Sequence, residues 1–253
     1  ESMTVVESDT DIVPFDPGSY ASSTTYVTGT AAKMAAEELR EKIIHKLAQF
    51  MDVKPEDIDF DGLVGTTKDG TKKMSVQELA PKLLVGTTSE QLNGFATWGS
   101  HTSPPPFMAS IAEVKVDKQT GQIIPLHMYN CVDCGTVVNP KLARVQVEGG
   151  AVQAIGMALY EDVRYSSNGR LETNNFMTYK IPTRQDIGEL HTAFVESYEE
   201  SGAYGVKSIG EIVINTACPA IQHAVKNAVG ADIRTLPMTP EKVFMGMDEK
   251  YKV

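Results

Sequence analysis

In the first half of the chain, one segment has hydrophobic residues at the spacing of a helix and another has them at the spacing of a strand. From about residue 30 to residue 51, apolar residues recur at helical intervals with charged residues between them, which predicts an amphipathic helix. Thr28 or Thr30 is expected to cap its first turn. Residues 4–13 favour a strand that leads into a proline-containing turn.

Turn signals divide the segment that follows this helix. Residues 52–74 predict a hairpin that turns at Asp69 and Gly70. Ser75 and Glu78 have the spacing of a capping box, which predicts a short helix directly after the hairpin.

The second half opens on alternating apolar and polar positions, which predict a hairpin with strands over residues 110–117 and 123–131. Asn139 followed by Pro140 is typical of a helix start, and the pattern extends this helix to about Tyr160. The other expected elements are a hairpin over residues 162–173 that turns at Asn168 and Gly169, strands over residues 176–181 and 191–198, and a helix over residues 216–229 that ends at Gly230.

A connector separates the two halves. Residues 94–106 include three consecutive prolines and predict neither helix nor strand. We therefore expect two subdomains, residues 1–103 and residues 104–253. Their elements predict an α+β fold in which mixed sheets pack against helices.

Composition narrows the classes of function. The 33 acidic and 23 basic residues give a formal net charge of -10, which disfavours binding to a nucleic-acid backbone. No apolar run approaches the roughly 20 residues that span a bilayer, and the start lacks a signal-peptide pattern, so we expect no membrane association. Three cysteines are too few for a disulfide framework and favour a cytoplasmic location. The abrupt start suggests a fragment or a subunit.

Two cysteines have the spacing of a metal or redox pair. Cys131 and Cys134 lack the second pair that a four-ligand site needs, and two small residues at a strand end are the simpler interpretation. The five histidines show no metal-ligand spacing and are expected to be structural.

Glu211 is the strongest candidate for catalysis. It follows Gly210 and lies among isoleucines and a valine in a segment expected to be extended. Burial of a carboxylate among apolar side chains raises its pKa and prepares it for proton transfer near neutral pH. The alternative is a glutamate at a strand edge whose carboxylate simply reaches solvent.

One face of the helix predicted after Pro140 carries Gln146, Gly149, Gly150 and Gln153. Glycine costs about 1 kcal/mol in a helix interior, so something is expected to approach the backbone there. That neighbour is either a packed element of the protein or a flat ligand that pairs with a glutamine amide. The hydroxyl-rich residues 18–29 similarly either bind an anionic group or bond only their own backbone.

These residues, in this order, resemble the C-terminal half of the molybdopterin-binding subunit of the xanthine dehydrogenase, or molybdenum hydroxylase, family. The resemblance covers most of the chain, and several ordered motifs are more specific than any single one. The motifs are Asn139-Pro140 and residues 146–156, 179–182, 207–211, 217–221 and 18–22.

The resemblance implies a fold, a cofactor and a reaction. Molybdenum would be held by molybdopterin, expected in its cytosine dinucleotide form, with no protein ligand to the metal. The enzyme would hydroxylate an electron-poor carbon of a purine, another N-heterocycle or an aldehyde, using water. In that reaction Glu211 would be the general base, and hydride would pass to the Mo=S group.

The resemblance also assigns cofactor contacts. Gln146 would bond the pterin, and Gly210 would also contact the cofactor. The loop Ala21, Ser22, Ser23 and Thr24 would lie against the cofactor near the metal. Ser23 stands where the family loop commonly has arginine. Two bulky residues, Ile212 and Val213, follow the glutamate where the family often has a small residue and proline. These departures leave phosphate contacts and pocket shape open.

The family's first half has no counterpart in this chain, including a glycine and phenylalanine loop over the metal. The chain alone is therefore expected neither to retain the cofactor nor to turn over. Expected partners are the N-terminal half of the molybdenum subunit, a [2Fe-2S] iron-sulfur subunit and an FAD subunit. The last two are expected because this chain has only three cysteines, too few for an iron-sulfur cluster, and no flavin-binding motif, so it cannot carry electrons away from the metal. The alternatives are a non-catalytic fragment or relative that docks against other subunits, and a redox module built on the cysteine pair.

Overall fold

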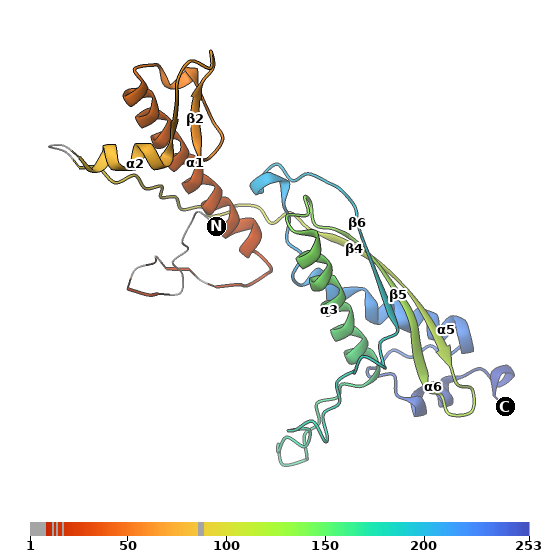
Figure 1. Ribbon diagram of the computed structural model, residues 1–253. Coiled ribbons are helices and arrows are strands. Elements are labelled where there is room, and N and C mark those ends of the chain that lie inside the picture. Colours follow the sequence, from red (N-terminus) through yellow and green to blue (C-terminus); the bar gives the residue numbers. More distant parts are fainter. Residues whose placement is uncertain (1–8, 12, 14, 17, 86–88, 253) are drawn as a thin grey trace. The chain divides into compact units, whose positions relative to one another are not determined.

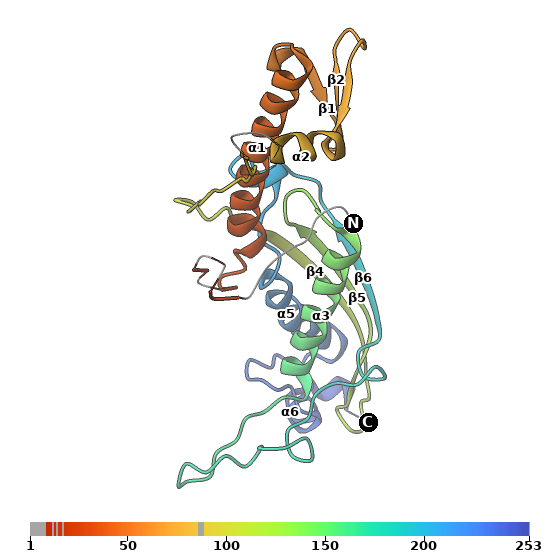
Figure 2. The same cartoon turned by 60° about the vertical axis from the view of Figure 1, so that its left-hand side comes forward.

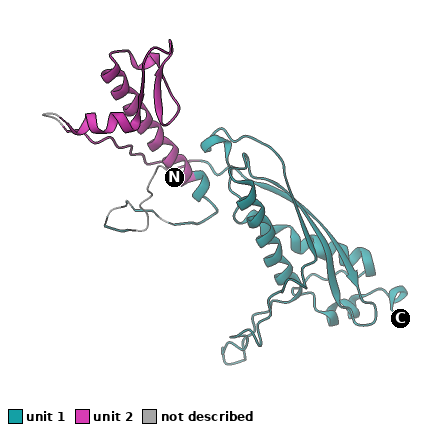
Figure 3. Ribbon diagram, in the orientation of Figure 1, with its two compact units in different colours: residues 1–26, 102–253 teal, residues 27–101 magenta. Residues whose placement is uncertain are grey.

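A computed structural model describes residues 9–11, 13, 15–16, 18–85 and 89–252, and two views of it are shown in Figures 1 and 2. The chain divides into two compact units (Figure 3). The larger unit comprises residues 1–26 and 102–253, and the smaller unit comprises residues 27–101. Most of the strand expected over residues 4–13 lies outside the described residues.

The smaller unit contains most of helix α1 (Thr24–Met51), a three-stranded antiparallel sheet and helix α2 (Val76–Leu84). A short 3-10 helix (Pro55–Asp57) leads into strands β1 (Ile58–Phe60), β2 (Val64–Thr67) and β3 (Lys73–Ser75). Its core is formed by Leu47, Ala48, Met51, Ile58 and Leu79.

Two local predictions in this unit are confirmed and one is wrong. Asp69 and Gly70 lie in the turn between β2 and β3, and Ser75 and Glu78 form a reciprocal capping box. Helix α1, however, begins at Thr24, so Thr28 and Thr30 lie inside it instead of capping it. Threonine is a weak helix former, but the tertiary contacts of Tyr26 that are described below hold the threonine-rich start of α1 in the helix.

The larger unit is built on a second three-stranded sheet of order β4-β5-β6. Strands β4 (Phe107–Val116) and β5 (Ile123–Asp133) form the expected antiparallel hairpin. Strand β6 (Glu189–Phe194) pairs with β5 in parallel, after a crossover through helix α3 (Pro140–Leu159).

Helices cover one face of this sheet. Side chains of α3 and of helix α5 (Ala217–Val229) share one core with inward-facing strand residues such as Met128. The opposite face of β5 carries Tyr129 and Cys131, which are exposed. The unit also contains a 3-10 helix (Ala203–Gly205), the short helix α4 (Ile212–Asn215), helix α6 (Pro240–Gly246) and a final 3-10 helix (Glu249–Tyr251).

The start of α3 and the end of α5 follow the sequence signals. The Asn139 side chain accepts a hydrogen bond from the Leu142 backbone amide, with Pro140 at the first helical position. Gly230 ends α5 with φ of 77°, the left-handed conformation that glycine adopts without strain.

Three extended segments differ from their predictions. The hairpin expected over residues 162–173 forms around the Asn168-Gly169 turn, with an antiparallel bridge between Tyr165 and Leu171, but its arms are not continuous strands. Residues 176–181 are not a strand, because Asn175 turns the chain: its side-chain oxygen accepts from the Met177 amide, and its carbonyl accepts from the Tyr179 amide. The strand expected over residues 191–198 begins at Glu189 and ends at Phe194.

The α+β class predicted from the sequence is confirmed, with two separate sheets and packed helices. Within the described ranges, every helix is too short or too polar to cross a membrane.

Candidate functional site

Three segments far apart in the sequence meet around Glu211, and all belong to the larger unit. Ser22 Oγ donates a hydrogen bond of 2.8 Å to Glu211 Oε2. Gln146 Nε2 on α3 donates a hydrogen bond of 2.9 Å to the carbonyl oxygen of Gly210. The structure therefore brings together Ser22, Gln146, Gly210 and Glu211, all of which the sequence analysis named.

Ser22 reaches Glu211 from a strained turn. Ala21 and Ser22 have φ of 48° and 57°, in the left-handed region that residues other than glycine seldom adopt. The Ser23 amide donates to the Tyr20 carbonyl across this turn at 3.0 Å. Two consecutive residues at positive φ cost free energy, so the surrounding contacts have to hold the loop in place.

Gly210 makes this approach possible. A Cβ atom at position 210 would lie 2.8 Å from Ser22 Oγ, closer than real Cβ contacts. A side chain there would displace the loop or turn the serine hydroxyl away from Glu211. The glycine before the glutamate therefore has a packing role, and its carbonyl is fixed by Gln146.

The other residues of this loop either form hydrogen bonds within the loop or are exposed to solvent. Ser23 Oγ donates to the Tyr20 carbonyl at 2.8 Å, and the Ser19 and Thr24 hydroxyls share a hydrogen bond of 2.8 Å. These contacts correspond to the local alternative, in which the hydroxyls bond within their own loop. Ala21 is exposed.

The local structure around Glu211 corrects two expectations. The segment is a helical turn rather than a strand, with Glu211 immediately before α4, and Glu211 is exposed in this chain. In a helical turn, successive side chains point in different directions, so Val213 is buried while Glu211 is not. The apolar neighbours in sequence therefore do not enclose the carboxylate.

The two adjacent glycines of α3 have different roles. A Cβ at position 150 would lie 2.2 Å from Val213 Cγ2, so Gly150 allows α4 to pack against α3. A Cβ at position 149 would meet nothing within 4 Å, and Gln146, Gly149 and Gln153 are exposed. The packing interpretation holds for Gly150, whereas Gly149 leaves bare backbone beside two glutamine side chains.

An ion pair holds the segment that leads to Glu211. Lys207 Nζ lies 2.7 Å from Asp133 Oδ2, and the exposed fractions of these side chains are 9% and 20%. Ser197 Oγ and the Gly135 amide donate to Asp133 Oδ1 at 2.5 Å and 3.0 Å. Burial opposes ionisation of Asp133, but these hydrogen bonds, led by that of Lys207, lower the pKa of its carboxyl below the usual value.

The sequence analysis did not assign a role to this pair. Lys207 begins the motif 207–211, but its partner lies 74 residues earlier, at the end of β5. The nearby cysteines do not form a pair, since Cys131 is exposed and Cys134 is buried. Burial, reinforced by the charge of Asp133, raises the pKa of the Cys134 thiol.

Tyr26 and Tyr179 fix the neighbouring segments. The buried Tyr26 hydroxyl lies 2.6 Å from Ser201 Oγ, which ties the start of α1 to the segment before Lys207. The Tyr179 hydroxyl donates to Glu161 Oε2, and this bond raises the pKa of Tyr179. A Cβ on Gly156 would lie 2.1 Å from Glu161 Oε1, so a side chain there would displace this carboxylate from its place against α3.

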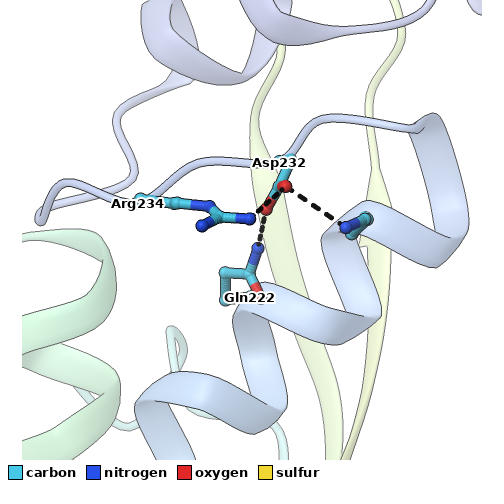
Figure 4. A network of polar contacts seen from close by, with 4 residues as sticks. Gln222, Asp232 and Arg234 are labelled. Atoms are coloured by element: carbon cyan, nitrogen blue, oxygen red, sulfur yellow. Dashed lines mark hydrogen bonds and ion pairs between the residues drawn. The ribbon is translucent and has the colours of Figure 1, made fainter.

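A separate polar cluster lies at the C-terminal end of α5 (Figure 4). Asp232 accepts hydrogen bonds from Gln222 at 2.9 Å, Lys226 at 3.2 Å and Arg234 at 3.0 Å. The Arg234 hydrogen bond, followed by that of Lys226, holds the pKa of Asp232 below its usual value. Asp232 thus holds the side chains of α5 and Arg234 together, which indicates a structural role.

The residues around Glu211 fit a flat, polar ligand. The exposed α3 face offers the bare backbone of Gly149 between the amide side chains of Gln146 and Gln153. An amide side chain both donates and accepts hydrogen bonds, as the edge of a pterin requires. The turn at Ala21 and Ser22 lies beside the Glu211 carboxylate, and Ala21 is exposed there.

Comparisons with known proteins identify the family of this chain. The family profile described as "Molybdopterin cofactor-binding domain" matches residues 1–188. The chain is 36% identical to a "Probable hypoxanthine oxidase" of Escherichia coli (strain K12), over 98% of this chain and 26% of that protein. It is 35% identical to a "Xanthine dehydrogenase molybdenum-binding subunit" of Escherichia coli O157:H7, over 93% of this chain and 32% of that protein.

Solved structures show the same fold. A CO dehydrogenase from Oligotropha carboxidovorans superposes with a TM-score of 0.81 at 25% identity, covering 93% of this chain and 30% of that chain. Quinoline 2-oxidoreductase from Pseudomonas putida 86 gives a TM-score of 0.81 at 27% identity, covering 91% and 30%.

This chain spans about a quarter to a third of the length of these relatives. The profile match covers the loop at Ser22 and the helix α3, which carry two of the three segments that meet at Glu211. The match over most of the chain and the shared fold establish that this chain belongs to the molybdopterin cofactor-binding domain family.

Proposed function

We propose that this chain forms part of the cofactor pocket of a molybdenum hydroxylase and that Glu211 is its general base. The observation that carries the proposal is the convergence of the Ser22 loop, Gln146 and the Gly210-Glu211 segment. These are the residues that the family resemblance assigns to cofactor and catalysis. Their meeting in one place gives the assignment a physical basis.

Each segment has a distinct part in holding the cofactor. Gln146 fixes the Gly210 carbonyl through Nε2 and presents its amide edge beside the open backbone of Gly149. The loop Ala21, Ser22, Ser23 and Thr24 would lie along the cofactor near the metal. When bound, the cofactor supplies a molybdenum centre that accepts two electrons from the substrate carbon, with water as the source of oxygen.

Glu211 is oriented for proton transfer by Ser22. The serine hydroxyl binds Oε2, which restricts rotation of the carboxylate and leaves Oε1 as the atom that we expect to receive the proton. Because Glu211 is exposed in this chain, shielding from water has to come from another part of the assembly. We assign this role to the N-terminal half of the molybdenum subunit.

The rest of the proposed assembly follows from the family. The cofactor would be the cytosine dinucleotide form of molybdopterin, and iron-sulfur and FAD subunits would remove the electrons. The substrate would be a purine, another N-heterocycle or an aldehyde, and the enzyme would be cytoplasmic. The Ser23 hydroxyl already donates its hydrogen to the Tyr20 carbonyl. Ser23 would therefore bind a phosphate more weakly than the arginine that the family commonly has at this position.

One observation favours the alternative of a docking fragment without catalysis. Glu211 is exposed, and so are the apolar side chains of Leu142 and Val145 on α3. An exposed apolar face on a helix is typical of a surface that another domain covers. Both proposals therefore require a partner, and only the role of Glu211 separates them.

The test is Glu211→Gln in the complete, reconstituted enzyme. Glutamine keeps the shape of the side chain and can still accept from Ser22, but it is a far weaker base. Turnover should fall at least about a hundredfold, while molybdenum and pterin contents remain unchanged.

The matched control is Glu200→Gln, which removes an exposed carboxylate from the same unit and should leave turnover unchanged. Wild-type turnover in the Glu211 variant would refute the general-base role and favour the docking alternative. Loss of molybdenum or pterin together with turnover would show that Glu211 retains the cofactor rather than moving a proton.

A further inference from the structure

Two histidines and a glutamate form a compact group on the outer face of the larger sheet. His127 lies on β5, and Glu189 and His191 lie on β6. The parallel register pairs His127 with Glu189 and Tyr129 with His191, so all four side chains point to the same face. This is the face opposite to α3 and α5.

The three ligand atoms form a nearly regular triangle. His127 Nδ1 lies 3.3 Å from His191 Nε2 and 3.5 Å from Glu189 Oε2, and His191 Nε2 lies 3.8 Å from the same carboxylate oxygen. Zinc bonds to imidazole nitrogen and carboxylate oxygen are about 2.0–2.1 Å long, so two ligand atoms on a tetrahedral zinc lie about 3.3–3.4 Å apart. Adjacent ligand atoms of an octahedral ion with bonds of that length would lie only about 2.8–3.0 Å apart.

We propose that His127, Glu189 and His191 bind a divalent transition metal, zinc in the first instance, as three ligands of a tetrahedral site. Imidazole and carboxylate together suit zinc, and water would occupy the fourth position. The site is separate from the proposed molybdopterin pocket, in which these residues have no part.

A hydrogen-bonded triad is the competing explanation, and the distances argue against it. The two imidazole nitrogens are near enough for a long hydrogen bond, but Glu189 Oε2 is 3.5 Å and 3.8 Å from them. Hydrogen bonds from nitrogen to oxygen are about 2.7–3.2 Å long. The carboxylate oxygen is therefore too far from both nitrogens for a hydrogen bond, but its position suits an ion between the three atoms.

The sheet orients the ligands before any metal binds. Tyr129 stacks on His191 with ring centroids 4.5 Å apart and planes at 12°, which restricts rotation of this imidazole. The exposed fractions of the His127, His191 and Glu189 side chains are 33%, 43% and 67%, so an ion can reach them from solvent. The net charge of -10 attracts cations to the chain as a whole.

A bound metal would connect β5 to β6 through side chains. It would bridge the two ends of the crossover that contains α3, the helix that carries Gln146. Because the ion binds residues on two strands that are brought together only by folding, zinc should stabilise the folded state and raise the melting temperature.

The test is titration of the metal-free full chain with Zn²⁺ by isothermal titration calorimetry, with Co²⁺ as a spectroscopic probe. We expect one zinc per chain and the intense visible absorption of tetrahedral cobalt. His127→Ala and His191→Ala should each weaken zinc binding by at least about tenfold. Glu189→Gln should weaken it as well, since an amide oxygen is a poorer ligand.

One control separates this site from adventitious binding. His223→Ala removes an exposed histidine from α5 and should not change the affinity. Circular dichroism checks that each variant folds, and His191→Gln replaces any alanine variant that does not. Absence of zinc binding by the wild-type chain, equal affinity in the ligand variants, or an octahedral cobalt spectrum overturns the proposal.

Discussion

Lys207 Nζ lies 2.7 Å from Asp133 Oδ2, and this largely buried ion pair ties the segment before Glu211 to the end of β5. Gly135 strengthens the junction, because a Cβ at that position would lie 2.3 Å from the Gly205 carbonyl oxygen. The Lys207 amide also donates to the Cys134 carbonyl at 2.8 Å. The position of the candidate base therefore depends on a junction between two distant stretches of chain.

Lys207→Met should destabilise the fold by about 3 kcal/mol, because it leaves the Asp133 carboxylate buried without its counter-ion. Chemical denaturation of the wild-type and variant chains measures the difference. Arg234→Met is the control, since its ion pair with Asp232 involves a side chain that is 82% exposed. That change should stay within about 0.5 kcal/mol. Equal losses in the two variants would contradict the importance of the buried pair.

The same carboxylate should make stability depend on pH. The pKa of Asp133 is lower in the folded chain than in the unfolded chain, so its contribution is present above the unfolded value of about 4. It is lost as pH falls through the folded pKa, because the unfolded state then binds the proton more readily. Between about pH 5 and pH 3, the free energy of unfolding should fall more steeply for wild type than for Asp133→Asn. Parallel profiles would show that Asp133 does not contribute.

Substitution by alanine should change the stability of the chain in opposite directions at the two adjacent glycines of α3. Gly149→Ala should stabilise the chain by up to about 1 kcal/mol, because its Cβ meets nothing and alanine favours the helix. Gly150→Ala should destabilise it by about 1–3 kcal/mol, since its Cβ would overlap Val213. Thermal unfolding of the two variants measures both effects. Stabilisation by Gly150→Ala would mean that α4 does not pack closely on α3.

Three local signals in the sequence predicted element ends correctly, whereas the cap expected for α1 was wrong. Asn139 with Pro140, the Ser75 and Glu78 box, and Gly230 all act through contacts within a few residues, so the structure confirms them. Extended segments were harder to predict. An isolated apolar run does not distinguish a strand from a helical turn, and Val213 adopts the turn because Gly150 opens space for it on α3.

The candidate site was predictable only in part. Family resemblance named Glu211, Gln146 and the Ser22 loop, but not that Ser22 would bond Glu211 or that Gln146 would hold the Gly210 carbonyl. The exposure of Glu211 follows from the direction of α4, which the local sequence does not specify. His127 and His191 are 64 residues apart, and only the parallel pairing of β5 with β6 brings them together.

The bond between Ser22 and Glu211 joins residues that are 189 positions apart in the chain. A ribosome therefore has to synthesise the segment beyond residue 211 before the loop can find its partner, and closing so long a loop is a late event in folding. The earlier part of the chain emerges with the loop and α3 but without the carboxylate that completes the candidate site. Under the proposed function, molybdopterin should consequently be inserted after translation, into a chain whose C-terminal region has already folded.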